Sequence, residues 1–226
     1  MKTLTNYLRS LVRDTIIWDL RQRVRDRREL RLWVQAGKPL PPPHVVKQQI
    51  VARHASAFGA HTLIETGTFR GQMIYAMKRY FDKIVSIELS ETLYMAAKRR
   101  FRGYSSIEIL HGDSGEVLPR VLGNISARCV FWLDGHYSGG DTARANIETP
   151  IAKELQTILN HPAKGNVILI DDARLFDGTH DYPTLDELRS LVTGYWPECS
   201  LLVCNDVIRL HPKRDFAETC EACASI

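Results

Sequence analysis

Acidic side chains recur at one kind of position in this sequence, at or directly after short apolar runs with the composition of β-strands. Ligands of open parallel sheets bind outside the carboxyl ends of the strands, where carboxylates can accept hydrogen bonds from ligand hydroxyl groups. Acids placed without functional constraint would fall mostly on helices, so this recurrence predicts a polar binding site at the strand ends. The acids are Glu65, Glu88, Asp113, Asp134, Asp171 and Asp172.

The segment from Glu65 to Gly71 predicts a tight turn between a strand and a helix. Gly67 and Gly71 allow the backbone to turn sharply and to approach a ligand. The turn lacks the Gly-x-Gly-x-x-Gly spacing of dinucleotide sites, which disfavours a nicotinamide cofactor. Taken alone it is equally compatible with an ordinary turn. However, Glu88 ends the next apolar run about twenty residues later, where a carboxylate can accept both ribose hydroxyls of a nucleoside.

The elements that must position these acids alternate along the chain. Strand-like runs alternate with helical patterns, which indicates an α/β fold with a mostly parallel, doubly wound sheet of seven strands. A closing hairpin around Asn205-Asp206 makes the last strand antiparallel. Strands are expected over 61–65, 83–88, 106–110, 129–134, 166–171, 200–204 and 207–210, and helices over 44–58, 72–81, 90–102, 116–122, 149–159 and 185–193.

Positive charge is concentrated at the start of the chain. The formal net charge of the 226 residues is +4, but residues 1–31 hold nine basic and four acidic residues, whereas the remainder holds 21 basic and 22 acidic. The body is therefore nearly neutral, and no nucleic-acid partner is expected for it. We predict a basic amphipathic helical extension with a proline-rich linker over 1–43, one domain over 44–212 and a loose tail over 213–226.

The N-terminal helix has two interpretations. It packs as a lid over the substrate entrance or in a dimer, with its arginines solvated, or it lies on an anionic membrane surface or polyanion. The sequence has no secretory pattern and no apolar run of about 18 residues, and its five cysteines are an odd number for a disulfide framework. A cytoplasmic protein, with or without peripheral membrane contact, is expected. Cys220 and Cys223 have metal-site spacing but no second ligand pair, so a loose tail is the preferred interpretation.

Together, the Glu-Thr-Gly-Thr-x-x-Gly turn, the acid of Val85-Ser86-Ile87-Glu88 and the run Gly112-Asp113-Ser114 resemble the class I S-adenosylmethionine (SAM)-dependent methyltransferases. The resemblance covers about residues 60–210 and implies their Rossmann-like fold with a reversed last strand. It places Glu65 and Gly67 by the methionine part of SAM, Glu88 on the ribose, and Asp113 and Ser114 near the adenine. The common first motif has a further glycine where Thr68 or Phe69 now stands. The expected SAM-binding set is Glu65, Thr66, Gly67, Thr68, Gly71, Glu88, Asp113, Ser114 and Asp134.

The fourth and fifth strands are similar to those of the metal-dependent O-methyltransferases, such as the types that act on catechols or macrolide sugars. In that group an acid after strand four and an acid pair after strand five hold a divalent ion. The resemblance therefore implies Asp134, Asp171 and Asp172 as Mg²⁺ ligands, consistent with the preference of Mg²⁺ for hard oxygen donors. Adjacent strand residues point to opposite faces, so Asp172 reaches the ion only if the chain turns there. Otherwise it is a helix cap or an outer acid.

His136 lies two residues beyond Asp134, close to where the resembling enzymes carry a catalytic base, and it is either that base or a structural loop histidine. Catalysis is thus expected from His136 and Asp134. The predicted function is SAM-dependent, Mg²⁺-assisted O-methylation of a small hydroxylated substrate, such as a sugar, glycoside or other natural product. The alternatives are a nucleotide-binding oxidoreductase and an inactive binding protein with the methyltransferase fold.

Overall fold

The computed structural model describes residues 16–135, 149–163 and 165–213. Contacts within the chain divide it into two units, Met1–Lys47 and Gln48–Ile226. The first unit contains helix α2 (Ile16–Gln35), which is followed by the proline-rich segment. In this unit the indole Nε1 of Trp33 donates a hydrogen bond to the carbonyl of Pro39 at 2.8 Å, which ties the linker back to the end of the helix. Helix α3 (His44–Phe58) begins in the first unit and continues into the second.

The second unit is built on one seven-stranded sheet with the strand order β3-β2-β1-β4-β5-β7-β6. The first five strands are parallel, and β7 runs antiparallel to both of its neighbours. The predicted doubly wound sheet with a reversed last strand is therefore confirmed. The strands are β1 (Thr62–Thr66), β2 (Lys83–Glu88), β3 (Ile107–His111), β4 (Cys129–Leu133), β5 (Val167–Ile170), β6 (Cys199–Cys204) and β7 (Val207–Pro212).

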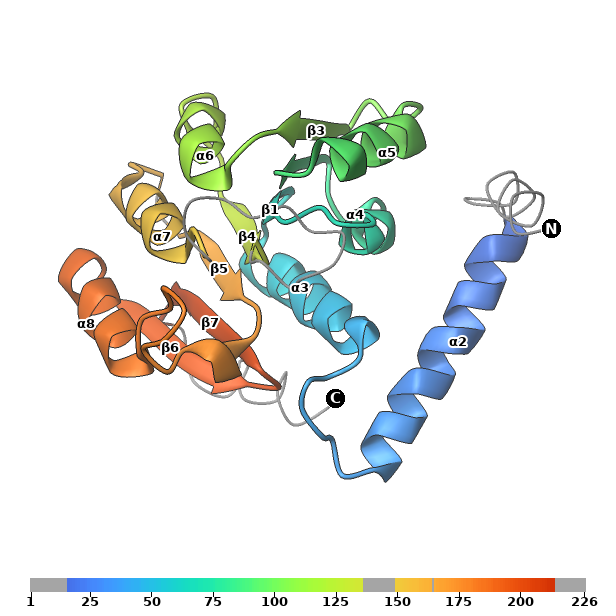
Figure 1. Ribbon diagram of the computed structural model, residues 1–226, viewed down its shortest axis with the longest axis horizontal. Helices are drawn as coiled ribbons and strands as arrows, with labels where there is room; N and C mark the ends of the chain where they lie inside the picture. The colour runs from blue at the N-terminus through green and yellow to red at the C-terminus, as the bar shows by residue number, and fades with distance from the viewer. Residues whose placement is uncertain (1–15, 136–148, 164, 214–226) are drawn as a thin grey trace. The chain divides into compact units, whose positions relative to one another are not determined.

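Helices cover both faces of the sheet (Figure 1). The chain runs outward from β1 to β3 and then returns to β4 on the other side of β1, so right-handed crossovers place the helices of the two halves on opposite faces. On one face, α6, α7 and α8 lie side by side, whereas α4 and α5 lie on the other. These helices are α4 (Gln72–Met77), α5 (Glu91–Phe101), α6 (Ser114–Leu122), α7 (Ile151–Asn160) and α8 (Leu185–Tyr195).

The hydrophobic core lies between the sheet and the α6–α8 layer. Strands β4 and β5 are buried along their whole length, the pattern of parallel strands covered on both faces. Strand β4 ends at Leu133 and β5 at Ile170, each one residue before the acid that the sequence predicted as the strand's last residue. Asp134 and Asp171 therefore lie just outside the sheet. Among the described residues, no helix has the length and apolarity needed to cross a bilayer.

Candidate active site

The carboxyl ends of β1, β4 and β5 meet at one edge of the sheet. The N–H of Asp134 donates to the carbonyl of Thr66 at 3.1 Å, and the N–H of Asp171 donates to the carbonyl of Leu133 at 3.0 Å. The loops after these three strands thus begin side by side. Since β1 and β4 are also where the strand order reverses, this is the position at which doubly wound sheets bind their ligands.

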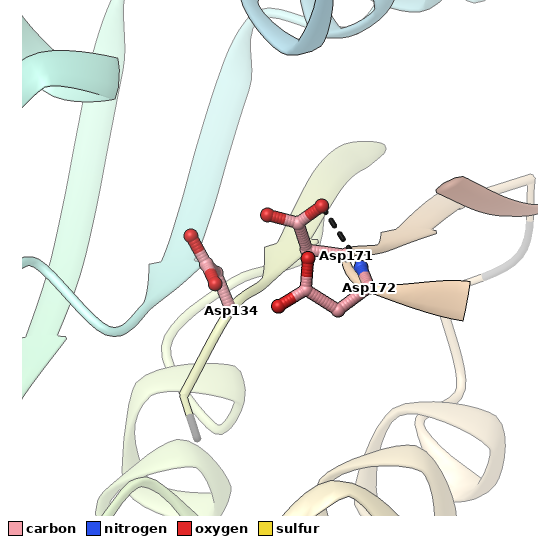
Figure 2. Close-up of side chains that lie close together, drawn as sticks. All are labelled: Asp134, Asp171 and Asp172. Atoms are coloured by element: carbon pink, nitrogen blue, oxygen red, sulfur yellow. Dashed lines mark hydrogen bonds between the residues drawn. The ribbon is translucent and has the colours of Figure 1, made fainter. Parts of the chain in front are cut away.

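Three carboxylates converge at this edge: those of Asp134, Asp171 and Asp172 (Figure 2). Each offers an oxygen, and the three oxygens lie within 4.8 Å of one another. Asp171 and Asp172 are buried, with 4% and 5% of their surface exposed, and Asp134 is half-buried. Negative charges that lie this close together and are shielded from water repel one another, and a divalent cation bound by their oxygens offsets that repulsion. The donor set therefore fits a Mg²⁺ ion.

The chain turns sharply at Asp172, and this turn brings the two consecutive acids to the same side. Asp172 has φ 55° and ψ 48°, in the left-handed region that is uncommon for residues other than glycine. Its N–H donates to Oδ1 of Asp171 at 2.9 Å. Although Asp172 precedes the short 3₁₀ helix η1 (Ala173–Leu175), its side chain makes no capping hydrogen bond there. Consecutive residues of a strand point to opposite faces, but this turn lets Asp171 and Asp172 point to the same side. That is the arrangement two ligands of one ion require.

Sequence reasoning missed an ion-pair network that holds this turn. Arg174 donates from Nη1 to Oδ1 of Asp172 at 2.8 Å and also to Oδ2 of Asp206, a buried residue between β6 and β7. Asp206 additionally accepts the N–H of Arg174 at Oδ1, at 2.9 Å, and its carbonyl accepts the N–H of Ala173. The guanidinium and the hairpin turn therefore fix the orientation of Asp172.

The glycine turn lies directly against the end of β4. Gly67 has φ 83°, and its N–H donates to the carbonyl of Ile87 at 3.0 Å. A Cβ at Gly67 would lie 2.3 Å from the carbonyl oxygen of Asp134, so only glycine fits. The sequence predicted that the backbone at Gly67 approaches a ligand. In the described residues it closely approaches the backbone of Asp134. Gly71, with φ 66°, precedes α4, and a Cβ there would meet the ring of Phe101.

Glu88 joins the glycine turn to the end of β2. Its Oε2 accepts the N–H of Phe69 at 2.7 Å, and its Oε1 accepts the N–H of Ser90 at 2.8 Å. Burial raises the pKa of Glu88, and the hydrogen bonds from the Ser90 and Phe69 amides counteract part of that rise. A carboxylate has about four acceptor positions. The group can therefore hold the turn and still accept ribose hydroxyls.

Glu65 supports the turn from below through two hydroxyl groups. Ser86 donates to Oε2 of Glu65 at 2.5 Å, and the Oγ atoms of Ser86 and Thr68 are 2.6 Å apart. Because the single hydroxyl hydrogen of Ser86 goes to Glu65, Thr68 donates to Ser86. Burial raises the pKa of Glu65 well above its usual range; the Ser86 bond opposes this, and the charges of Asp134 and Glu88 add to it. A place for Glu65 beside the methionine part of SAM stays a prediction.

The turn after β3 contains the expected adenine-side residues. Asp113 caps α6, and its Oδ1 accepts the N–H of Gly115 at 2.8 Å. Ser114 is buried beside Glu154 of α7, an acid that sequence reasoning missed. Glu154 is 1% exposed and lies in the apolar face formed with Ile151, Leu155 and Ile158. Its place in that i, i+3, i+4, i+7 pattern was the signal that could have revealed it.

Glu154 approaches the ends of β1 and β4. A Cβ built on Gly135 would lie 3.2 Å from Oγ1 of Thr66 and 3.4 Å from Oε1 of Glu154, so all three groups meet there. Burial raises the pKa of Glu154 to about 7; the hydroxyls of Ser114 and Thr66 oppose this rise, and the charge of Asp113 adds to it. Glu154 is thus expected to titrate near neutral pH rather than in the usual acidic range.

Replacing this buried acid should change how stability depends on pH. A carboxyl whose pKa is raised by folding stabilises the folded state most at low pH, and stability falls as pH rises from about 4.5 through about 7. The wild type should lose this stability as pH rises, whereas Glu154→Gln, which has no titrating group there, should not. The difference in unfolding free energy between variant and wild type should therefore shift by about 2 kcal/mol in favour of the variant from about pH 5 to about pH 8. Urea unfolding measures this, with Glu91→Gln at an exposed helix position as control. A difference that is constant with pH would contradict the assignment.

The structure thus places the described members of the predicted set at one sheet edge. Glu65 and Thr66 end β1, Gly67, Thr68 and Gly71 follow it, and the predicted acids lie at or just after the ends of β2 to β5. The buried carboxylate of Glu88 at the β2 end provides acceptors of the kind that fit the ribose of a nucleoside such as that of SAM. His136 lies outside the described residues, as do Cys220 and Cys223.

No protein-family model matches the chain, and no curated protein matches it at a significant level. Solved structures do match. An O-methyltransferase from Bacillus cereus in complex with SAH is 14% identical, with a TM-score of 0.56 over 82% of this chain and 90% of that one. The O-methyltransferase TomG from Streptomyces achromogenes, involved in tomaymycin synthesis and solved with SAM, is 16% identical, with a TM-score of 0.56 over 83% and 88%. SAH-bound PaMTH1 from Podospora anserina is 16% identical, with a TM-score of 0.50 over 82% and 88%.

Proposed function

We propose that this chain, which has the fold of the SAM-dependent methyltransferases, is an O-methyltransferase for a small hydroxylated substrate and is assisted by Mg²⁺. The observation that supports the proposal best is the convergence of Asp134, Asp171 and Asp172 at the ends of β4 and β5, beside the switch point of the sheet. Hydroxyl acceptors of the sugar, glycoside or natural-product type suit a hard cation, because their oxygen can join its ligands.

Each part of the site has a separate task in this proposal. SAM, when bound, supplies an electrophilic methyl group, and Mg²⁺, when bound, supplies a Lewis acid that lowers the pKa of a hydroxyl group. Glu88 accepts the ribose hydroxyls, and the turn at Gly67 and the capped start of α6 border the rest of the cofactor. The three aspartates would hold the cation, which would supply positive charge beside that turn. His136 takes the proton of the acceptor hydroxyl.

The two alternative functions are less well supported. A nucleotide-binding oxidoreductase needs neither an acid pair after β5 nor the Gly-x-x-x-Gly spacing of this turn, and the matched structures described above are methyltransferases. An inactive binding protein has no need to keep three carboxylates close together and largely buried, because their repulsion destabilises the fold.

Calorimetric titration with SAM, with and without Mg²⁺, tests the cofactor assignment. We expect SAM to bind and NADH not to bind. Glu88→Gln should weaken SAM binding about thirtyfold, since an amide cannot replace a carboxylate that accepts ribose hydroxyls and backbone amides together. The matched control is Glu108→Gln, on the neighbouring strand and exposed, which should leave the affinity unchanged. Heat from NADH alone would favour the oxidoreductase, and no heat from SAM would contradict the proposal.

The acceptor itself can be found by a product screen. Methyl-labelled SAM, Mg²⁺ and the protein are incubated with collections of hydroxylated metabolites, and labelled methyl ethers are sought by mass spectrometry.

A cytoplasmic location is also proposed, supported by the free thiols of Cys129, Cys199 and Cys204, which persist in a reducing compartment.

A further inference from the structure

Charges of opposite sign are separated on the two sides of helix α2. Successive residues of a helix are rotated by about 100°, so positions can be assigned to sides from the sequence. Within Ile16–Gln35, all the acids lie on the same side of the helix axis as the buried Trp33. They are Asp19, Asp26 and Glu29. Arg25 belongs to that half, since its Nε lies 3.5 Å from Oε1 of Glu29.

The opposite half, which we call the arginine face, contains five arginines and no acid within this described helix. Aliphatic side chains that would normally be buried lie exposed between the arginines. Leu20 is 56% and Val24 67% exposed, and Leu32 and Val34 are also exposed. The arginine face consists of Leu20, Arg21, Arg23, Val24, Arg27, Arg28, Arg31, Leu32 and Val34. Aliphatic and basic residues thus share one side of the helix, while buried Trp33 lies on the other.

We propose that the arginine face binds the surface of a bilayer that contains anionic lipids. Its arginines span about 15 Å along the helix, so a helix lying in the membrane plane can place all five near lipid phosphates at once. Each basic residue near an anionic bilayer strengthens binding, and guanidinium groups pair well with phosphates. Leu20 and Val24 then enter the boundary between headgroups and acyl chains, while the arginine stems extend outward to the charge.

Two other occupants fit this face less well. A second copy of the chain, related by a two-fold axis, would present the same face and set arginines against arginines. A single-stranded nucleic acid would satisfy the charges but leave Leu20, Val24 and Val34 in water, and the face has no aromatic side chain on which a base could stack. An anionic bilayer satisfies both the charges and the aliphatic groups. This inference does not depend on the proposed methyl transfer.

Co-flotation of the full chain with vesicles tests the proposal. We expect binding to vesicles of phosphatidylcholine mixed with phosphatidylglycerol, and none to phosphatidylcholine alone. Arg23→Gln, Arg27→Gln and Arg31→Gln together should lower the partition coefficient about a hundredfold. The matched control removes three exposed arginines from α5, its end and α6, through Arg99→Gln, Arg102→Gln and Arg120→Gln, and should bind as the wild type does. Gln favours helix about as well as Arg, and thermal melting confirms folding.

A second variant distinguishes a bilayer from other polyanions. Leu20→Gln with Val24→Gln keeps every charge, so it should weaken vesicle binding about tenfold and leave any binding to a polyuridine oligomer unchanged. The proposal is overturned if neutral and anionic vesicles bind equally, if the control triple variant loses as much as the α2 triple variant, or if the aliphatic variant still binds vesicles fully. Dissociation of a dimer by the α2 triple variant, without vesicle binding by the wild type, would assign the face to a second copy.

Discussion

An Asp171→Asn variant is expected to lose methyl transfer by about a thousandfold while it keeps its affinity for SAM. The change preserves the shape of the side chain and removes its charge. Asp171 is buried, its Oδ1 accepts the N–H of Asp172, and its carboxylate is one of the three that converge at the ends of β4 and β5. Loss of one charge from a set of three should weaken divalent-ion binding strongly, whereas Glu88, the proposed ribose acceptor, ends β2 and is not altered.

Two measurements separate the roles of metal and cofactor in this variant. Mn²⁺ binding, followed by calorimetry, should weaken at least about a hundredfold, and turnover is measured with the acceptor found in the screen. The matched control is Asp186→Asn, an exposed acid in the first turn of α8, which should behave as the wild type. EDTA should abolish wild-type turnover, and Mg²⁺ should restore it. Turnover that survives EDTA would contradict the metal, and full activity of Asp171→Asn would contradict the site.

The sheet and the convergence of acids could be predicted because both depend on local pattern. Alternating strand-like and helical segments predict parallel strands, and parallel strands bring their carboxyl ends to one edge. Asp134 and Asp171 are therefore neighbours in space although they are far apart in the sequence. The cap at Ser90 was predictable for the same reason: its side chain accepts the N–H of Leu93, a contact within one turn of helix.

Other parts of the site depend on geometry that no local pattern encodes. The pairing of Arg174 with Asp206 requires β7 to lie between β5 and β6. The sequence predicted a closing hairpin with an antiparallel strand at or near an edge of the sheet, but not this strand order. The left-handed backbone at Asp172 is held by that pairing and by the hydrogen bonds to Asp206, so it too follows from tertiary structure. Helix α4 ends at Met77, earlier than its predicted end at residue 81. The predicted tail over 213–226 lies, apart from Lys213, outside the described residues.

A Gly67→Ala variant is expected to lose about 3 kcal/mol of unfolding free energy together with its SAM affinity. Gly67 has φ 83°, a conformation that costs an alanine about 1 kcal/mol or more. The added Cβ would also lie 2.3 Å from the carbonyl oxygen and 2.8 Å from the carbonyl carbon of Asp134. Both atoms belong to backbone that is held in place by the bond from the Asp134 N–H to Thr66, so the clash cannot be relieved by a side-chain rotation.

The melting temperature should accordingly fall by roughly 10 °C, given about 2–4 °C per kcal/mol for a domain of this size. Gly103→Ala is the matched control, because a Cβ there meets nothing within 4 Å and its melting temperature should hardly change. Gly67 belongs to the turn that is proposed to border SAM, and Asp134, which it contacts, is proposed to bind the metal. A shift of either residue should therefore weaken SAM and Mn²⁺ binding together. A Gly67→Ala protein that melts like the wild type and binds both normally would show that the turn and the end of β4 can separate without consequence.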